Sequence, residues 1–217
     1  MKTGGKKGFV DTIDEPADLK AVGQFLMGLA QIVSSFKDVV ADLANGNGAH
    51  DVSFEFKSKG DLIFVVGESY DDICSSLYLQ EFHKMEATAE VVSDSSKEAK
   101  VEKAIASMIE KDFINAVHSV KEGGLYVSLV EMAIPRGLGF DVEADGEFRL
   151  DAYLFGEGKG RMLISVNEEK EDAFIEFMST LDVPSTLLGH VTKGKMVIDG
   201  EHFGFINEVK DELAKAL

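Results

Sequence analysis

The fold of this chain is decided by the stretch AVHSVKEGGL at residues 116–125. Its apolar first half predicts a short strand, and the apolar residues from Leu125 to Ile134 predict a helix that Pro135 ends. Backbone N–H groups at such a strand–helix junction can contact an anion closely, because the two glycines place no side chain in the way. The stretch therefore predicts an α/β unit and a candidate anion site, although a glycine pair is also typical of plain turn geometry.

Strands and helices alternate on both sides of this stretch. The apolar run at 62–66 predicts a strand covered on both faces. Further strands are expected at 52–57, 139–143, 162–166, 187–192 and 196–199, and further helices at 98–112, 168–181 and 205–217. Val101, Ile105, Met108 and Ile109 are expected to point inward from the first of these helices. This order predicts an α/β fold, a layered α+β sandwich, over about residues 50–217.

The N-terminal region has a different character. Residues 1–15 are rich in Gly and Lys, which predicts a flexible segment, and residues 16–44 carry an apolar stripe at helical spacing. The Asn-Gly repeat at 45–48 ends this helix. Three apolar positions per heptad favour a helix packed on its own domain over a coiled-coil seam, and a homodimer through the stripe stays open. The expected division is residues 1–48 and residues 49–217.

Charge and cysteine content exclude several classes of protein. The chain has 22 Lys and Arg against 39 Asp and Glu, a net charge of −17, which opposes binding to nucleic acid or to an anionic membrane. A local basic pocket for a phosphate ester is still allowed. The one cysteine cannot form an intrachain disulfide, and the longest uncharged run, residues 21–36, is shorter than the ~20 apolar residues of a spanning helix. These features predict a cytoplasmic protein.

A second candidate segment is LFGEGKGR at residues 154–161. Its three glycines would let a ligand approach the backbone beside Glu157, Lys159 and Arg161, and a charged flexible loop is the equal alternative. A P-loop is excluded because Gly-Lys-Ser/Thr is absent and a strand follows. The five histidines show no pair at metal-ligand spacing, which argues against zinc, and the context of Cys74 argues against a nucleophile.

Residues 116–125, followed by Glu-Met-Ala at 131–133, resemble the His-Asp-Val-Ser-Asp-Gly-Gly-Leu signature of the PurM/PurL superfamily of aminoimidazole-ribonucleotide-synthetase-like ATP enzymes. Other motifs follow the expected order, at 60–63, 78–79, 137–141, 154–157 with 160–161, and 188–194. Together they resemble the C-terminal domain of phosphoribosylformylglycinamidine synthases, PurL. The resemblance covers about residues 50–217 and implies an AIR-synthase-related, PurM C-terminal-domain-like mixed sheet flanked by helices.

The resemblance implies ATP-dependent amidation of formylglycinamide ribonucleotide in purine biosynthesis. In that family ATP phosphorylates the substrate amide oxygen, and ammonia from a glutaminase displaces the phosphate. Nucleotide and substrate bind between a β-rich N-terminal domain and the C-terminal domain. The implied cofactors are ATP and Mg²⁺, and the implied partners are the remaining PurL domains, a glutaminase and a small PurS-like subunit. The alternative is a non-catalytic PurL-like module for assembly or regulation with a degenerate nucleotide site.

The signature departs from the family at several acidic positions. Ser119, Lys121 and Glu122 stand where the family has Asp, Ser and Asp, and Leu77 stands where an upstream Glu is usual. Loss of hard oxygen ligands argues against Mg²⁺ binding by this chain, so no metal site is predicted. A lysine at position 121 would contact a phosphate directly. The expected phosphate-facing rim consists of His118, Lys121, Gly123, Gly124, Gly156 and Glu157.

Overall fold

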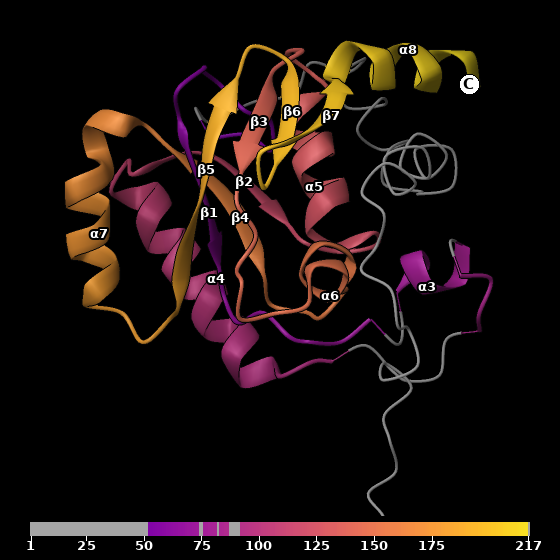
Figure 1. Cartoon of the computed structure of the whole chain (residues 1–217). Helices are drawn as coiled ribbons and strands as arrows, with labels where there is room; N and C mark the ends of the chain where they lie inside the picture. The colour runs from indigo at the N-terminus through magenta and orange to yellow at the C-terminus, as the bar shows by residue number, and fades with distance from the viewer. Residues whose placement is uncertain (1–51, 74–75, 82, 87–91, 217) are drawn as a thin grey trace, which may run out of the picture.

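A computed structural model describes residues 52–73, 76–81, 83–86 and 92–216 of the chain (Figure 1). The predicted helix at 16–44 and Cys74 lie outside these residues. Within them the chain forms one mixed sheet of seven strands in the order β2-β4-β1-β5-β3-β6-β7. The strands are β1 Leu62–Val66, β2 Ile114–Ser119, β3 Gly139–Val142, β4 Met162–Val166, β5 Ser185–Thr192, β6 Lys195–Ile198 and β7 Glu201–Phe205. The predicted layered α/β class is confirmed.

Helices cover both faces of the sheet, as Figure 1 shows. The helices are α3 Leu77–Glu81, α4 Ser95–Glu110, α5 Gly124–Ala133, α6 Leu150–Phe155, the 3-10 turn η2 Glu168–Lys170, α7 Glu171–Ser179 and α8 Ile206–Ala216. Apolar residues of α4 and α7 form one core with the sheet, and those of α5 and α6 form a second core on the other face. No helix in the described part of the chain is long and apolar enough to cross a membrane.

The central strand β1 shows why two cores form. Phe64 and Val66 belong to the core under α4 and α7, whereas Ile63 and Val65 belong to the core under α5 and α6. Successive side chains of a strand point to opposite faces, so an uninterrupted apolar run needs cover on both sides. The prediction of a strand buried on two faces is therefore confirmed.

The sheet register gathers several loops at one end. β1 is antiparallel to both β4 and β5, and Val66 lies opposite Met162 and Ser185. β2 is antiparallel to β4, with Ser119 opposite Met162. The carboxyl ends of β1 and β2 therefore lie beside the amino ends of β4 and β5. This end of the sheet carries both sites described below.

Some local predictions were wrong. The expected strand at 52–57 is only a bridge, in which Val117 N–H donates to the Ser53 carbonyl over 2.9 Å. The segment then leaves the sheet, because Phe56 N–H donates to the Met132 carbonyl of α5. On α4, Ile109 is 38% exposed instead of inward. The helices at 77–81 and 150–155 and the strand β7 were not predicted.

Candidate functional site

The predicted rim begins at the turn between β2 and α5. Gly123 and Gly124 both have left-handed backbone conformations, with φ of 77° and 71°. Gly124 N–H donates to the Lys121 carbonyl over 2.9 Å, which closes a tight turn, and Lys121 and Glu122 are exposed on its outside. The left-handed region strongly favours glycine, so the turn explains both glycines before any ligand is considered.

The start of α5 is occupied by a carboxylate of the chain itself. Glu157 Oε1 accepts from Gly123 N–H over 2.9 Å and from Leu77 N–H over 2.8 Å. Burial raises the pKa of the Glu157 carboxyl above its ordinary value, and the two backbone hydrogen bonds oppose that rise. One side chain thus supplies the negative charge that the amino ends of α3 and α5 favour. The structure brings Glu157 to the predicted anion position as the anion.

Close backbone contacts restrict Gly124, which packs on α6, and Gly156, which packs on the Ala152 carbonyl of α6 and on the Asp72 carbonyl. A Cβ on Gly124 would lie 2.6 Å from the Leu154 carbonyl oxygen, and a Cβ on Gly156 would lie 2.4 Å from the Ala152 carbonyl oxygen. These are backbone atoms, which cannot rotate away as a side chain does. Packing therefore requires a glycine at position 124 whether or not a ligand binds there, and the ligand approach stays a prediction.

His118 is engaged in a buried pair. Its Nε2 lies 3.1 Å from Oε2 of Glu131, which is 2% exposed, and its Nδ1 lies 2.8 Å from the Ser119 carbonyl oxygen. Both ring nitrogens thus face an oxygen atom, and which of them donates depends on the tautomer. Phe54 meets the imidazole edge to face. His118 therefore joins β2 to α5. The sequence signal for its partner was Glu131 itself, an acidic residue within an otherwise apolar helix.

Arg161 was expected in a charged loop but is buried at 2% exposure. Nη1 donates to the Tyr153 carbonyl over 3.0 Å and Nη2 donates to the Gly156 carbonyl, both at the end of α6. Burial without a carboxylate partner lowers the pKa of Arg161 to about 10. A cation at the carboxyl end of a helix satisfies its last carbonyl groups. The interpretation as a flexible loop is wrong for this residue, which orders the segment carrying Glu157.

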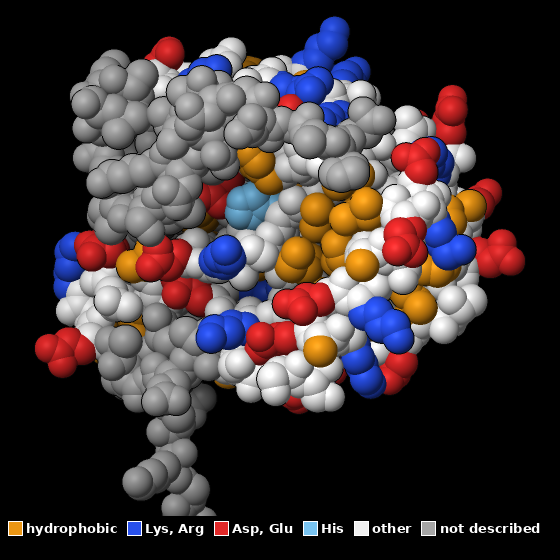
Figure 2. Space-filling view, turned by 180° about the vertical axis from the view of Figure 1, so that it is seen from behind, with side chains coloured by type: hydrophobic (Ala, Val, Ile, Leu, Met, Phe, Trp, Pro, Cys, Tyr) orange, Lys and Arg blue, Asp and Glu red, His pale blue; other side chains and the backbone are white. Residues whose placement is uncertain are grey.

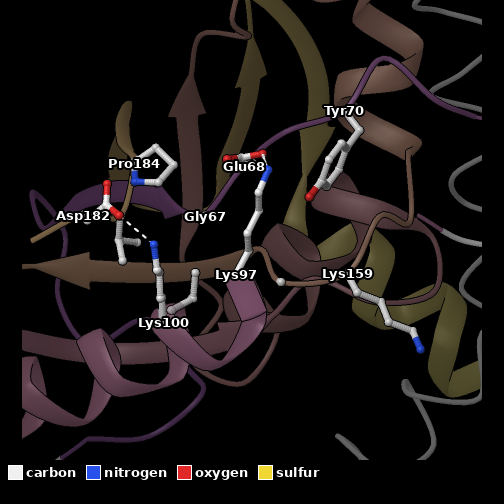
Figure 3. A pocket seen from close by; sticks show the side chains of 11 residues that line it. Gly67, Glu68, Tyr70, Lys97, Lys100, Lys159, Asp182 and Pro184 are labelled. Atoms are coloured by element: carbon white, nitrogen blue, oxygen red, sulfur yellow. Dashed lines mark hydrogen bonds and ion pairs between the residues drawn. The ribbon is translucent and has the colours of Figure 1, made fainter. Parts of the chain in front are cut away.

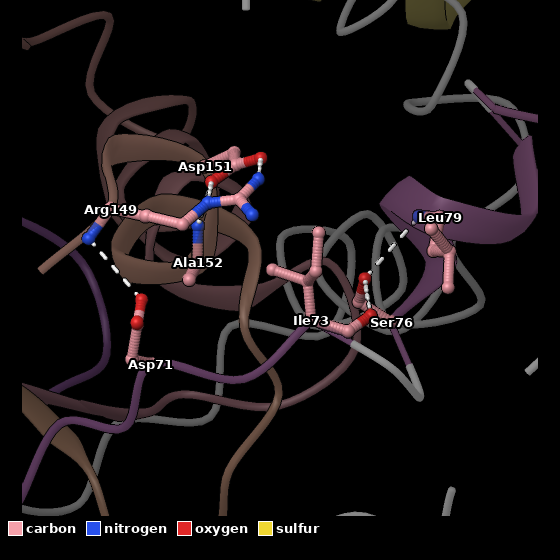
Figure 4. A network of polar contacts seen from close by, with 7 residues as sticks. All are labelled: Asp71, Ile73, Ser76, Leu79, Arg149, Asp151 and Ala152. Atoms are coloured by element: carbon pink, nitrogen blue, oxygen red, sulfur yellow. Dashed lines mark hydrogen bonds and ion pairs between the residues drawn. The ribbon is translucent and has the colours of Figure 1, made fainter. Parts of the chain in front are cut away.

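The segment before α3 is tied to the other end of α6 (Figure 4). Arg149 N–H donates to Asp71 Oδ1 over 3.3 Å, and Arg149 Nε donates to Asp151 Oδ1 over 3.0 Å. Ser76 Oγ accepts from Leu79 N–H and so caps α3. These contacts hold the start of α3 in place, so that Leu77 N–H can reach Glu157.

The six predicted rim residues are thus only partly united. Gly123 donates to Glu157, the adjacent Gly124 packs on Leu154 and Phe155, and Gly156 packs on the Ala152 and Asp72 carbonyls. His118 belongs to the pair with Glu131, and Lys121 projects into solvent. Phosphate binding at this rim stays a prediction. Over the described ranges, no group of three or more His, Cys, Asp or Glu is placed to hold a metal ion.

Comparison with known proteins gives one consistent family. A sequence model described as AIR synthase related protein, C-terminal domain, matches residues 58–200. The PurL subunit of phosphoribosylformylglycinamidine synthase from Moorella thermoacetica is 32% identical over 143 residues, which is 66% of this chain and 20% of that protein. The corresponding subunit from Alkaliphilus metalliredigens is 30% identical over 161 residues, which is 71% of this chain and 22% of that protein.

Solved structures agree on the fold. Thermotoga maritima PurL complexed with FGAR has a TM-score of 0.62 at 14% identity, and covers 73% of this chain and 29% of its own. PurLQS from the same organism has a TM-score of 0.55 at 15% identity, and covers 68% of this chain and 24% of its own. The chain spans about a fifth of the length of the curated relatives it matches.

Proposed function

The chain belongs to the AIR synthase related family, as a C-terminal domain of the PurL type, and we propose that it forms one wall of a phosphoribosylformylglycinamidine synthase. One observation carries the proposal. The family match from residue 58 to residue 200 contains the whole sheet from β1 to β6, so the motifs of the family occur in one folded unit. The reaction we propose is ATP-dependent amidation of formylglycinamide ribonucleotide, in which ATP supplies the phosphoryl group that activates the amide oxygen.

In this proposal the chain contributes a rigid, charged surface. Phosphoryl transfer depends mainly on positioning and on stabilising charge, and a wall held by Glu157 and Arg161 keeps the β2–α5 turn in one geometry. Lys121, exposed on that turn, would present a positive charge to a phosphate group. The motif residues fit Mg²⁺ poorly, because Ser119 and Leu77 stand where the family has carboxylates, Glu157 Oε1 already accepts from two N–H groups, and in the described residues no group of three or more His, Cys, Asp or Glu is placed to hold a metal ion.

The opposite wall would come from other parts of the synthase. We propose the remaining PurL domains, a glutaminase and a small PurS-like subunit as partners, because the chain corresponds to about a fifth of its curated relatives. Figure 2 shows hydrophobic side chains gathered on the face seen from behind, bordered by charged side chains of both signs. Such a patch is typical of a protein–protein contact. The cytoplasmic location and the domain boundary at residue 49 stay predictions.

Complementation tests this function. Moorella thermoacetica PurL truncated before its own C-terminal domain would be mixed with the chain, formylglycinamide ribonucleotide, ATP and ammonium, and ADP release would be followed. We expect no turnover from either piece alone, turnover from the mixture, and a lower rate with Lys121→Gln. Substrate-dependent turnover by the chain alone at an ordinary enzymic rate would contradict the single-wall proposal.

The alternative is a non-catalytic module that assembles with or regulates the synthase. The observations that favour it are the hydrogen bond from Gly123 N–H, at the amino end of α5, to Glu157, and the presence of Ser119 and Leu77 where the family has Asp and Glu. The same mixture separates the two proposals. Binding of the chain to the truncated synthase without recovery of ADP release supports the module and opposes the catalytic wall.

A further inference from the structure

A pocket of about 120 Å³ lies at the same end of the sheet, against α4 (Figure 3). Four segments line it: the loop after β1, the first turns of α4, the turn before β4 and the turn before β5. None of the predicted rim residues lines it. We propose that this pocket binds a phosphate group, either as free phosphate or as the head of a small phosphomonoester.

Two lysines of α4 line the pocket. Lys97 and Lys100 are three residues apart, so they project from the same side of the helix. Lys97 Nζ lies 2.5 Å from Glu68 Oε2, and Lys100 Nζ lies 2.6 Å from Asp182 Oδ2. The two lysine side chains are 47% and 53% exposed. Ion pairs this exposed contribute little to the stability of the fold, so either ammonium group can exchange its carboxylate partner for a dianion at small cost.

The floor of the pocket is backbone. A Cβ on Gly67 would lie 2.1 Å from the Gly160 carbonyl oxygen, so the two turns touch with no side chain between them. Gly67 N–H also donates to the Pro184 carbonyl over 2.9 Å, which fixes the floor to the turn before β5. Three of the four lining segments are thereby held together. A ligand would meet a pre-formed surface, which reduces the entropic cost of binding.

A hydroxyl donor stands beside the lysines. In Figure 3 the Tyr70 hydroxyl is directed toward Glu68 and Lys97, whereas the Lys159 amine points away from Lys100. The Tyr70 ring is placed by Gly158, where a Cβ would lie 2.6 Å from Tyr70 Cδ2. Burial and the charge of Glu68 raise the pKa of the Tyr70 hydroxyl, so it remains a neutral donor at physiological pH. Two ammonium groups and one hydroxyl are donors of the kind that phosphate accepts.

Charge and size decide the ligand class. The lining includes Lys97 and Lys100, which pair with Glu68 and Asp182, and Lys159, whose amine points away from Lys100. An anion would therefore bind by taking the place of a carboxylate beside the two paired lysines. A dianion between Lys97 and Lys100 would neutralise both, whereas a cation would add to their repulsion. The volume equals about four water molecules at roughly 30 Å³ each, enough for a tetrahedral oxyanion. The organic part of an ester would extend into solvent.

Calorimetric titration of the full chain tests the proposal at constant ionic strength set with chloride. The two probes are inorganic phosphate and ribose 5-phosphate. We expect saturable one-to-one binding that the double variant Lys97→Gln/Lys100→Gln weakens at least about tenfold, because each charge-assisted bond lost is of that order. Tighter binding of the ester than of free phosphate would identify a phosphomonoester, and equal binding would identify phosphate itself.

Lys170→Gln is the matched control. It removes a paired lysine of similar exposure, bound to Asp112 outside the pocket, so the net charge changes by one unit per site as in the pocket variants. Equal weakening by this control, per charge removed, would show a bulk charge effect and overturn the proposal. Absence of saturable binding would overturn it as well. Loss of binding in Lys121→Gln with retention in the double variant would place the phosphate at the β2–α5 turn, so failure here is distinguishable from failure of the proposed function.

Discussion

Replacement of Gly124 by alanine measures the packing of α5 on α6. The added Cβ would lie 2.6 Å from the Leu154 carbonyl oxygen and 2.7 Å from the Phe155 carbonyl carbon. These atoms belong to the backbone of α6, whose last carbonyls are held by Arg161. The clash can be relieved only by moving one helix away from the other. The residue also has φ of 71°, a conformation that an L side chain rarely adopts.

The cost has two parts. A left-handed conformation costs a residue with a side chain about 1–2 kcal/mol. Overpacking of a close-packed contact costs about 1–3 kcal/mol. The free energy of unfolding should therefore fall by roughly 2–5 kcal/mol. At about 2–4 °C per kcal/mol for a domain of this size, the midpoint of thermal unfolding should fall by roughly 4–20 °C.

Two other glycines separate these parts. Gly200 has φ of 78° and no atom within 4 Å of an added Cβ, so Gly200→Ala should show the conformational cost alone. Gly146 has open space and no left-handed φ, so Gly146→Ala should be near neutral. The reduced entropy of the unfolded chain affects all three variants alike and cancels in the differences. Urea unfolding at pH 7 and thermal unfolding give the three values.

A Gly124→Ala protein as stable as Gly200→Ala would refute the packing argument. It would mean that the α5–α6 contact can adjust without cost, and the glycine would need another explanation, such as access for a ligand. If the packing cost is found, loss of phosphate binding in a Gly124→Val variant cannot locate a binding site, because the variant disturbs both helices.

Two further predictions concern buried carboxyl groups. Glu157→Gln should be as stable as the unmodified chain or more stable at pH 7, because an amide oxygen can accept from the same two N–H groups without a buried charge. In Glu157→Ala the free energy of unfolding should fall by about 1–3 kcal/mol for each N–H left without an acceptor. Burial raises the pKa of Glu157 in the folded state above its ordinary value of 4.5, so the stability that its protonated form contributes is present below that pH and is lost as the pH rises through the folded pKa. When the free energy of unfolding is measured from pH 4 to 8, its decrease with rising pH should therefore be smaller in Glu157→Gln than in the unmodified chain. An unchanged slope would contradict this. In urea unfolding, His118→Ala should lower the free energy of unfolding by about 3–5 kcal/mol, because it leaves Glu131 buried without its partner. The double variant His118→Leu/Glu131→Leu should recover part of that loss. A double variant less stable than the single one would argue against the pair.

Elements with a strong local pattern were predicted well. β4 was expected at 162–166 and β1 at 62–66, and the structure has both at these residues. The helix expected from Leu125 to Ile134 is α5, shifted by one residue. An apolar run bounded by turn residues carries its own signal, because its burial requirement is visible in the sequence.

The segment at 52–57 shows where such a pattern misleads. Its alternating residues fit a half-buried strand, and Phe56 is indeed fully buried. However, Phe56 N–H pairs with the Met132 carbonyl of α5 instead of a neighbouring strand. Alternation reports which side chains are buried, and the backbone partner depends on which element lies beside the segment. That partner is a tertiary property.

Periodicity and the order of the motifs along the chain were enough to predict the layered α/β class, the buried central strands and the family. The sequence also identified the glycine turn at 123–124 and the segment around Glu157 as candidate binding segments. The contacts that these residues make became visible in the folded chain. Glu157 reaches Gly123 across 34 residues of sequence, Arg161 is buried at the end of α6, and three turns and the start of α4 line the pocket that holds Lys97 and Lys100. The physical reason is the antiparallel register at one end of the sheet, which brings together loops that no local pattern relates.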